Sequence, residues 1–147
     1  MSRNQVKSAY LWGGFGQSVT DFGVLVKFKL TLLVLFSAVM SYAIVGKGNV
    51  SWAGMILLTM GGFFVTGAAN ALNQVLEREY DRLMPRTANR PVVTGRMSVS
   101  TAVLLAGLMA LLGISLLTVF NPLTGFLGTL SLICYAFVYT PMKRTTP

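Results

Sequence analysis

Four long apolar runs dominate the sequence and restrict what it can fold into. They lie at residues 28–45, 52–76, 103–120 and 123–139. Each is close to the roughly 20 residues that a helix needs to cross the hydrocarbon of a bilayer. Backbone groups inside a bilayer must pair with one another, and no run alternates polar and apolar residues as a barrel strand does. The sequence therefore predicts an all-α, polytopic transmembrane helix bundle with four spans in this chain.

The composition and charge of the chain argue against a soluble domain. Hydrophobic residues make up 54% of the 147 residues and charged residues 11%, whereas about 25% of a soluble domain is charged. The net charge is +8, but the apolar runs separate the basic residues, so these do not form the continuous basic face of a nucleic-acid-binding protein. We therefore expect a lipid bilayer and no nucleic acid as partner. The sequence indicates no oligomeric state.

The distribution of Lys and Arg predicts the orientation of the spans. Of the 12 basic residues, all but Lys47 lie before or at the start of the first span, between the second and third, or after the fourth. The positive-inside rule assigns that side to the cytoplasm. The first span begins too far from Met1 to be a cleavable signal, and the N-terminal stretch lacks the composition of a mitochondrial transit peptide. We expect a multi-pass protein of the bacterial inner membrane, with the N-terminus and the loop at residues 77–100 on the cytoplasmic side.

Three polar side chains around the end of the second run recur every four residues. Asn73, Glu77 and Asp81 are each about one helical turn apart, so a helix places them on one face. The same face continues into the membrane through Asn70 and Thr66, at a depth where polar side chains are costly. Interhelical hydrogen bonding is the simpler explanation for Asn70 and Thr66. For the other three residues, the spacing indicates a binding site.

Charges of like sign stack beside that face, which is unusual for a helix end that contacts only water. Glu77 precedes Asp81 by four residues, and Arg78, Arg82 and Arg86 follow one another at the same interval. A solvated helix gains about 0.2–0.5 kcal/mol by placing opposite charges four apart. Carboxylates instead suit Mg²⁺, which commonly shares them with substrate phosphates, and arginines suit phosphate oxygens. The pattern therefore predicts a metal-bridged diphosphate on a lipid-soluble substrate.

The charged residues of the 77–100 loop are expected to have different roles. Arg86 and Arg90 lie beside the acidic face, so we expect them to contact the substrate. Topology and contact with anionic headgroups are sufficient to explain Arg82 and Arg96. Glu79 points away from the acidic face and is expected to be a solvated surface acid.

These residues also resemble a known family. Asn73-x-x-x-Glu77-x-x-x-Asp81 resembles the first acidic motif of the UbiA-type intramembrane prenyltransferase superfamily. The sequence at 84–91, Met-Pro-Arg-Thr-Ala-Asn-Arg-Pro, is similar to the protohaem IX farnesyltransferase (haem O synthase) branch of that superfamily, and so is the segment at 139–144. Lys27-Phe28-Lys29 stands where these enzymes usually carry basic–Pro–basic, and Phe28 departs from that pattern.

The resemblance implies a bundle of about nine spans with two acidic motifs that face each other through Mg²⁺ and a diphosphate. Only the first motif is present here, because the remaining acid besides Glu79 is Asp21, ahead of the first span. We therefore expect residues 1–147 to be the N-terminal part of a single membrane prenyltransferase domain, with a catalytic loop at 77–100. Such a chain is expected to be inactive alone.

The resemblance also implies a reaction. The farnesyl group of farnesyl diphosphate would be transferred to a vinyl group of haem b, giving haem O and diphosphate for the haem of cytochrome oxidase. The implied catalytic and Mg²⁺-binding residues are Asn73, Glu77 and Asp81. The implied diphosphate-binding residues are Arg86, Arg90, Lys143 and Lys29.

Two alternatives stay open from the sequence. One is another UbiA-type prenyltransferase that acts on a quinone or chlorophyll precursor, because acceptor chemistry lies mostly outside this segment. The other is a non-catalytic membrane bundle, such as part of a transporter, which would show broken spans and a charge near the midplane. Gly61-Gly62 hints at such a break, but no ionisable residue lies near the centre of a run.

Overall fold

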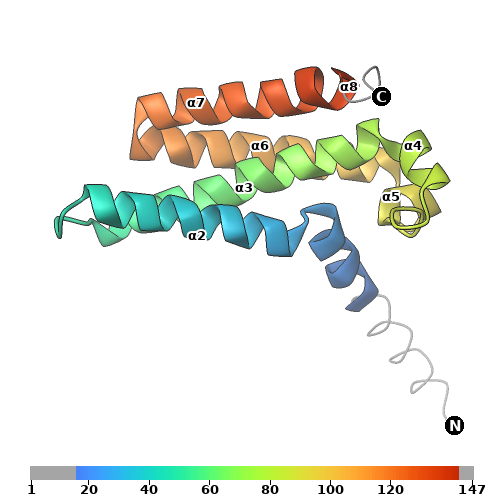
Figure 1. The fold of residues 1–147 in the computed structure, drawn as a ribbon, viewed down its shortest axis with the longest axis horizontal. Coiled ribbons are helices and arrows are strands. Elements are labelled where there is room, and N and C mark those ends of the chain that lie inside the picture. Colours follow the sequence, from blue (N-terminus) through green and yellow to red (C-terminus); the bar gives the residue numbers. More distant parts are fainter. Residues whose placement is uncertain (1–15, 143–147) are drawn as a thin grey trace, which may run out of the picture.

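The computed structural model describes residues 16–142, and the regular structure in them is entirely helical (Figure 1). A helix at residues 16–25 precedes the first long one. The long helices are α2 (Phe28–Val45), α3 (Trp52–Leu76), α6 (Val99–Phe120) and α7 (Pro122–Ile133), and α7 continues as the π-helical turn η1 (Cys134–Tyr139) and α8 (Thr140–Met142). The short helices α4 (Arg78–Leu83) and α5 (Pro91–Thr94) connect α3 to α6.

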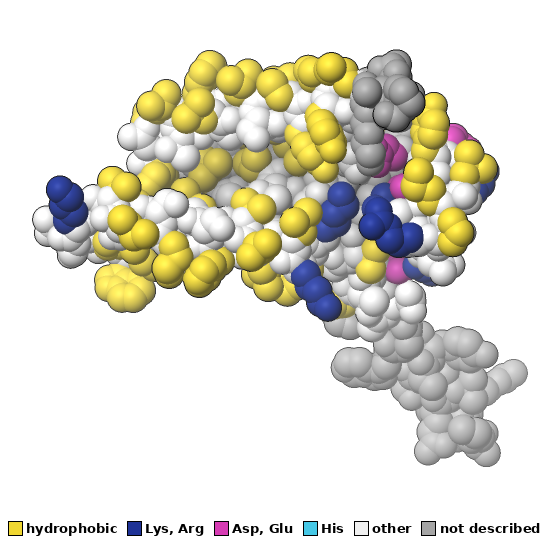
Figure 2. Space-filling model, in the orientation of Figure 1, with side chains coloured by type: hydrophobic (Ala, Val, Ile, Leu, Met, Phe, Trp, Pro, Cys, Tyr) yellow, Lys and Arg dark blue, Asp and Glu magenta, His cyan; other side chains and the backbone are white. Residues whose placement is uncertain are grey.

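The described residues contain four helices that are long and apolar enough to cross a membrane. They are α2, α3, α6, and α7 together with η1. Large apolar side chains cover their outer surfaces, which Figure 2 shows along the whole length of the bundle. A surface of this kind is stable in lipid and not in water. The predicted all-α polytopic bundle is therefore confirmed, and the protein is a multi-pass membrane protein.

Short polar side chains cap the helices where the chain enters them. The Ser51 hydroxyl accepts a hydrogen bond from the backbone N–H of Gly54 at the start of α3, and Ser98 accepts one from Thr101 at the start of α6. With Ser98 as its cap, α6 begins at Val99, about one turn before the apolar run at residues 103–120. At the tight reversal into α7, the Asn121 side chain accepts from the backbone N–H of Leu123.

Helix α3 is the central element of the bundle. It packs between α2 and α6, and α7 lies against α6 and, less extensively, against α3 (Figure 1). Helices α3 and α6 approach closely at Gly113: a Cβ added to Gly113 would lie 2.9 Å from the Gly61 carbonyl oxygen and 2.8 Å from the Val65 nitrogen. Because lipid supplies no hydrophobic force between helices, such close contact of small residues is what holds them together.

The ends of the bundle differ in charge. The link between α2 and α3 carries Lys47, whereas the end with α4 and α5 carries the described arginines and the described acids (Figure 2). At this end the chain also breaks between the 16–25 helix and α2, where Lys27 adopts the left-handed conformation with φ 50°. The candidate site lies here.

Candidate functional site

The junction between α3 and α4 places the predicted acidic face. Glu77 ends α3 with φ −91° and ψ 5°, yet the backbone bonds continue across it: Glu77 N–H donates to the Asn73 carbonyl (2.9 Å) and Asp81 N–H to the Glu77 carbonyl (2.8 Å). The side chains follow the same pattern, because Asn73 Nδ2 donates to Glu77 Oε2 at 3.1 Å. The helical spacing therefore survives the junction, and all three residues are buried.

A small cavity of about 110 Å³ opens beside this face, between α4 and the loop that follows it. It brings both predicted carboxylates together with both predicted substrate-binding arginines. Its lining residues are Glu77, Tyr80, Asp81, Met84, Arg86, Thr87 and Arg90. Acidic and basic groups thus share one cavity, which is the arrangement expected for a diphosphate and its metal ion.

Arg90 and Asp81 form an ion pair in the wall of this cavity. Their side chains are 18% and 6% exposed, so the pair is shielded from water. The hydroxyl of the buried Thr87 donates to the Asp81 backbone carbonyl at 2.9 Å and ties the loop to the end of α4. The predicted Arg-Thr-x-x-Arg segment therefore folds back onto the acidic face.

Asn73 connects the acidic face to the fourth span. Its Oδ1 accepts a hydrogen bond of 3.0 Å from the hydroxyl of Thr140, which is fully buried. The two residues are 67 positions apart, and no periodicity in the sequence links them. Thr140 was therefore missed as a site residue, and its place just before Pro141, in the segment that resembles the family, was the available signal.

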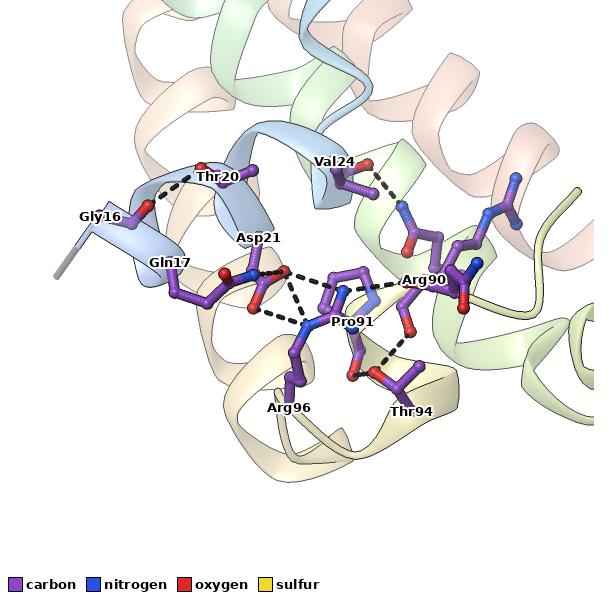
Figure 3. A network of polar contacts seen from close by, with 11 residues as sticks. Gly16, Gln17, Thr20, Asp21, Val24, Arg90, Pro91, Thr94 and Arg96 are labelled. Atoms are coloured by element: carbon purple, nitrogen blue, oxygen red, sulfur yellow. Dashed lines mark hydrogen bonds and ion pairs between the residues drawn. The ribbon is translucent and has the colours of Figure 1, made fainter. Parts of the chain in front are cut away.

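Arg96 binds within the protein rather than serving only as a topology signal. Its guanidinium donates to both carboxylate oxygens of Asp21, at 3.1 and 3.2 Å, and to the Asn89 carbonyl at 2.9 Å (Figure 3). Gln17 also donates to the Asp21 carboxylate, which is buried. These contacts attach the 16–25 helix to the loop that carries Arg90, and sequence reasoning had assigned Asp21 no partner.

One of the two predicted lysines, Lys29, lies apart from the cavity. Lys29 lies in the first turn of α2, is exposed, and is not one of the residues that line the cavity. Lys143 lies outside the described residues.

Glu79 behaves as the expected surface acid. Its side chain is 61% exposed and lies outside the cavity lining. The hydrogen bond from Arg78, helped by the charge of Arg82, lowers the pKa of the Glu79 carboxyl below its usual value. Glu79 thus differs from Glu77 and Asp81, which are buried, and serves as their natural control.

A second cavity of about 250 Å³ lies deeper in the membrane, between α2, α3 and the fourth span. Most of its lining is apolar, and the polar residues in it are Thr66, Asn70, Ser131 and Tyr135. Asn70 donates to the Val26 carbonyl at 3.2 Å and to the Thr31 hydroxyl at 3.4 Å. The simpler explanation, interhelical hydrogen bonding, therefore holds for Asn70.

The donor set fits a magnesium ion that completes its coordination with substrate oxygens. No group of three His, Cys, Asp or Glu side chains suited to a metal is found in residues 16–142. The acidic face offers two carboxylates and the Asn73 amide, all buried beside a cavity that contains two arginines. Mg²⁺ is commonly bound by one or two carboxylates plus substrate phosphates, so these residues suit a metal–diphosphate complex and not a metal alone.

Comparison with known proteins agrees with this chemistry. Residues 34–147 match the model of the UbiA prenyltransferase family. The chain is 41% identical over 129 residues to a protein of Christiangramia forsetii named protoheme IX farnesyltransferase, covering 88% of this chain and 43% of that protein. It is 40% identical over 119 residues to the mitochondrial protoheme IX farnesyltransferase of Homo sapiens, covering 80% and 27%.

The chain thus spans less than half the length of these curated relatives. No solved structure shows a significant match. The family match extends over most of the chain and includes the acidic face, the arginine loop and the fourth span. This chain belongs to the UbiA prenyltransferase family.

Proposed function

We propose that this chain is the N-terminal part of a protohaem IX farnesyltransferase, or haem O synthase. The observation that carries the proposal is the cavity shared by Glu77, Asp81, Arg86 and Arg90 at one end of a membrane bundle. The names of the relatives and the Arg-Thr-x-x-Arg-Pro sequence favour a haem acceptor. On this proposal, residues 1–147 belong to one membrane domain that needs a second acidic motif from elsewhere to turn over.

The acidic face and the arginines divide the work of holding the diphosphate of farnesyl diphosphate. Asn73, Glu77 and Asp81 would hold Mg²⁺, which supplies positive charge that neutralises the phosphate oxygens when it is bound. Arg86 and Arg90 stabilise the charge that develops on the leaving diphosphate, assisted by Lys29 and Lys143. Because Asp81 already holds Arg90 at the cavity wall, this guanidinium is oriented before the substrate arrives.

The reaction breaks the allylic C–O bond of farnesyl diphosphate, and the electron pair leaves with the diphosphate. The haem vinyl group supplies the electrons of the new C–C bond to the farnesyl carbon. Water then adds to the cation left on the former vinyl group and loses a proton, which gives the hydroxyethylfarnesyl group of haem O. The deeper apolar cavity offers a lipid-like surface for the isoprenoid chain.

The charge distribution supports an orientation. The end of the bundle with α4 and α5 carries most of the basic residues, and the positive-inside rule assigns it to the cytoplasm. A diphosphate site at this end lets the water-soluble diphosphate group of the substrate bind at the membrane surface while its isoprenoid chain stays in lipid. We propose the bacterial inner membrane as its location.

The test uses membranes that contain the complete gene product, supplied with haem b, farnesyl diphosphate and Mg²⁺. Extracted haem is analysed by mass spectrometry for the added mass of farnesyl plus water. Glu77→Gln is expected to lower the rate roughly 100-fold, because it removes a charge at the metal–diphosphate site. Glu79→Gln, the same change at the exposed acid two residues later, is expected to keep the wild-type rate.

Other outcomes discriminate between functions. Unchanged haem with release of diphosphate from the wild type would replace the haem acceptor by a quinone-type one. No product and no diphosphate release from a well-folded protein would contradict the enzyme proposal altogether. Equal loss in Glu77→Gln and Glu79→Gln would contradict the assignment of the acidic face.

A further inference from the structure

The helix is interrupted just before α2, although a continuous helix would have a lower conformational free energy at this point. The 16–25 helix ends, Val26 and Lys27 form a turn, and α2 starts at Phe28. Lys27 has φ 50° and ψ 56°, a left-handed conformation that is unfavourable for a non-glycine residue. Backbone strain of this kind persists only where surrounding contacts enforce it.

Two buried amide side chains of α3 hold this break. Gln74 Nε2 donates to the Val24 and Leu25 carbonyls at 2.8 and 3.0 Å. Asn70 Nδ2 donates to the next carbonyl, that of Val26, at 3.2 Å. Three consecutive carbonyls at the break therefore accept hydrogen bonds from α3. The Val24 carbonyl also accepts from the Lys27 N–H at 3.2 Å, and the Val26 carbonyl accepts from the Thr31 hydroxyl at 2.7 Å. All three carbonyls are satisfied, as a low-dielectric environment requires.

The contacts with the break determine the orientation of the Gln74 amide. Both contacts use the amide nitrogen, and Gln74 Oε1 is buried without a hydrogen-bond partner among residues 16–142. Leaving a buried acceptor unsatisfied is unfavourable, so a side chain that only filled space would be apolar. Gln74 leaves this acceptor unsatisfied and donates two hydrogen bonds to the break.

The position of the break relative to the candidate site gives these amides a functional meaning. Gln74 precedes Glu77 by three residues, which is less than one turn of α3. The break that Gln74 and Asn70 fix carries Lys27 in its turn and Lys29 directly after it. Two ammonium groups are thus attached to the backbone segment that is bonded to α3 beside the acidic face.

We propose that Gln74 and Asn70 are positioning residues for diphosphate binding. They hold the break so that Lys27 and Lys29 contribute positive charge to the diphosphate, whose metal ion the acidic face would hold. This inference rests on the proposed function for the identity of the substrate, but not on the identity of the acceptor.

The test compares substrate binding in the complete gene product, purified in detergent. Gln74→Met keeps the length of the side chain and removes both donated hydrogen bonds. It is expected to raise KM for farnesyl diphosphate about tenfold, with kcat and KM for haem b within about twofold of wild type. The Kd of inorganic diphosphate with Mg²⁺, measured by calorimetry, is expected to rise in parallel. Thr59→Val, whose lost hydroxyl bonds the Met55 carbonyl within α3, is the matched control.

A double-mutant cycle separates positioning from general damage. Lys27→Gln/Lys29→Gln is expected to weaken diphosphate binding about tenfold, and adding Gln74→Met to it is expected to change little further, because the lysines are the means by which Gln74 acts. Additive losses would overturn the inference, and so would an equal rise in KM for both substrates. Gln74→Asn, which shortens the arm by one methylene, provides a milder variant if Gln74→Met does not fold, and the same cycle applies to it.

The two proposals fail in different ways. If haem is not farnesylated but Gln74→Met still weakens diphosphate binding non-additively with the lysines, the acceptor is wrong and the inference stands. If haem is farnesylated and Gln74→Met binds diphosphate like the wild type, the inference is wrong and the proposed function stands. A wild-type protein that binds no diphosphate with Mg²⁺ would overturn both.

Discussion

The two halves of α3 are held in the bundle by different interactions. The half that begins at Trp52 approaches α6 through glycine: a Cβ on Gly61 would lie 2.8 Å from a methyl carbon of Leu117 and 3.2 Å from the Gly113 carbonyl. The half that ends at Leu76 buries amide side chains instead. These donate to carbonyls of the segment before α2 and to the Glu77 carboxylate at the end of α3. Only the second half continues into the candidate site.

The difference teaches where directional contacts are needed. Close packing of small residues fixes how near two helices lie, but dispersion has no preferred direction. Hydrogen bonds fix the direction of particular atoms, at the cost of placing polar groups in a low-dielectric environment. This chain uses the first interaction to build the bundle and reserves the second for the end where charged groups must be aimed.

The largest effect is expected from breaking the ion pair at the polar end. Asp81→Asn leaves the Arg90 guanidinium shielded from water without its counter-charge, and loss of one partner of such a pair costs about 3–5 kcal/mol. Unfolding of the complete gene product in mixtures of SDS and mild detergent, followed by circular dichroism, measures the loss.

Replacing both partners provides the control for that experiment. Asp81→Asn with Arg90→Met removes the stranded charge, so most of the stability is expected to return while prenyl transfer stays abolished. A double variant as unstable as Asp81→Asn would show that the ion pair is not the source of the loss.

An intermediate effect is expected from overpacking the glycine end. Gly113→Ala forces its methyl group against the backbone of α3, and such overpacking costs about 1–3 kcal/mol. The same unfolding titration measures it. Gly107→Ala, on the same helix with nothing within 4 Å of the added Cβ, is expected to leave stability unchanged or slightly higher.

The same variant tests the contrast between the two halves of α3. Because the damage lies away from the acidic face, the activity per folded molecule of Gly113→Ala is expected to remain near the wild-type value. A loss of activity in folded Gly113→Ala would mean that the glycine contact also aims the site.

The smallest effect is expected at the single hydrogen bond that joins the fourth span to the acidic face. Thr140→Val keeps the shape of the side chain and removes the donor to Asn73, which costs about 1 kcal/mol in stability. The rate of prenyl transfer is expected to fall by more than the loss of folded protein explains, since Asn73 also donates to Glu77. Thr129→Val, which loses a bond to the Gly125 carbonyl within its own helix, should reproduce the stability change without the loss of activity.

Sequence reasoning succeeded where one physical constraint dominates. The bilayer demands long apolar helices, so the four spans follow from hydropathy alone. The shared face of Asn73, Glu77 and Asp81 follows from helical spacing.

Contacts between distant segments were beyond such reasoning. Asp21 and Arg96 are 75 residues apart, and their pairing depends on how the 16–25 helix meets the loop. The left-handed Lys27 is equally hidden, because lysine has no preference for that conformation and the amides that stabilise it lie on another helix. The roles assigned to individual site residues stay predictions until the variants above are measured.

The π-helical turn at Cys134–Tyr139 acts as a phase shift in the fourth span. Each hydrogen-bonded ring of a π-helix encloses one more residue than that of an α-helix, so everything after the turn is rotated relative to the register set from Pro122. Removing one residue from the turn would swing Thr140 by about 100° and take its hydroxyl away from Asn73. The residues before the turn are thereby in the helical register that packs against α6, and the residues after it are in a register that directs Thr140 to the acidic face.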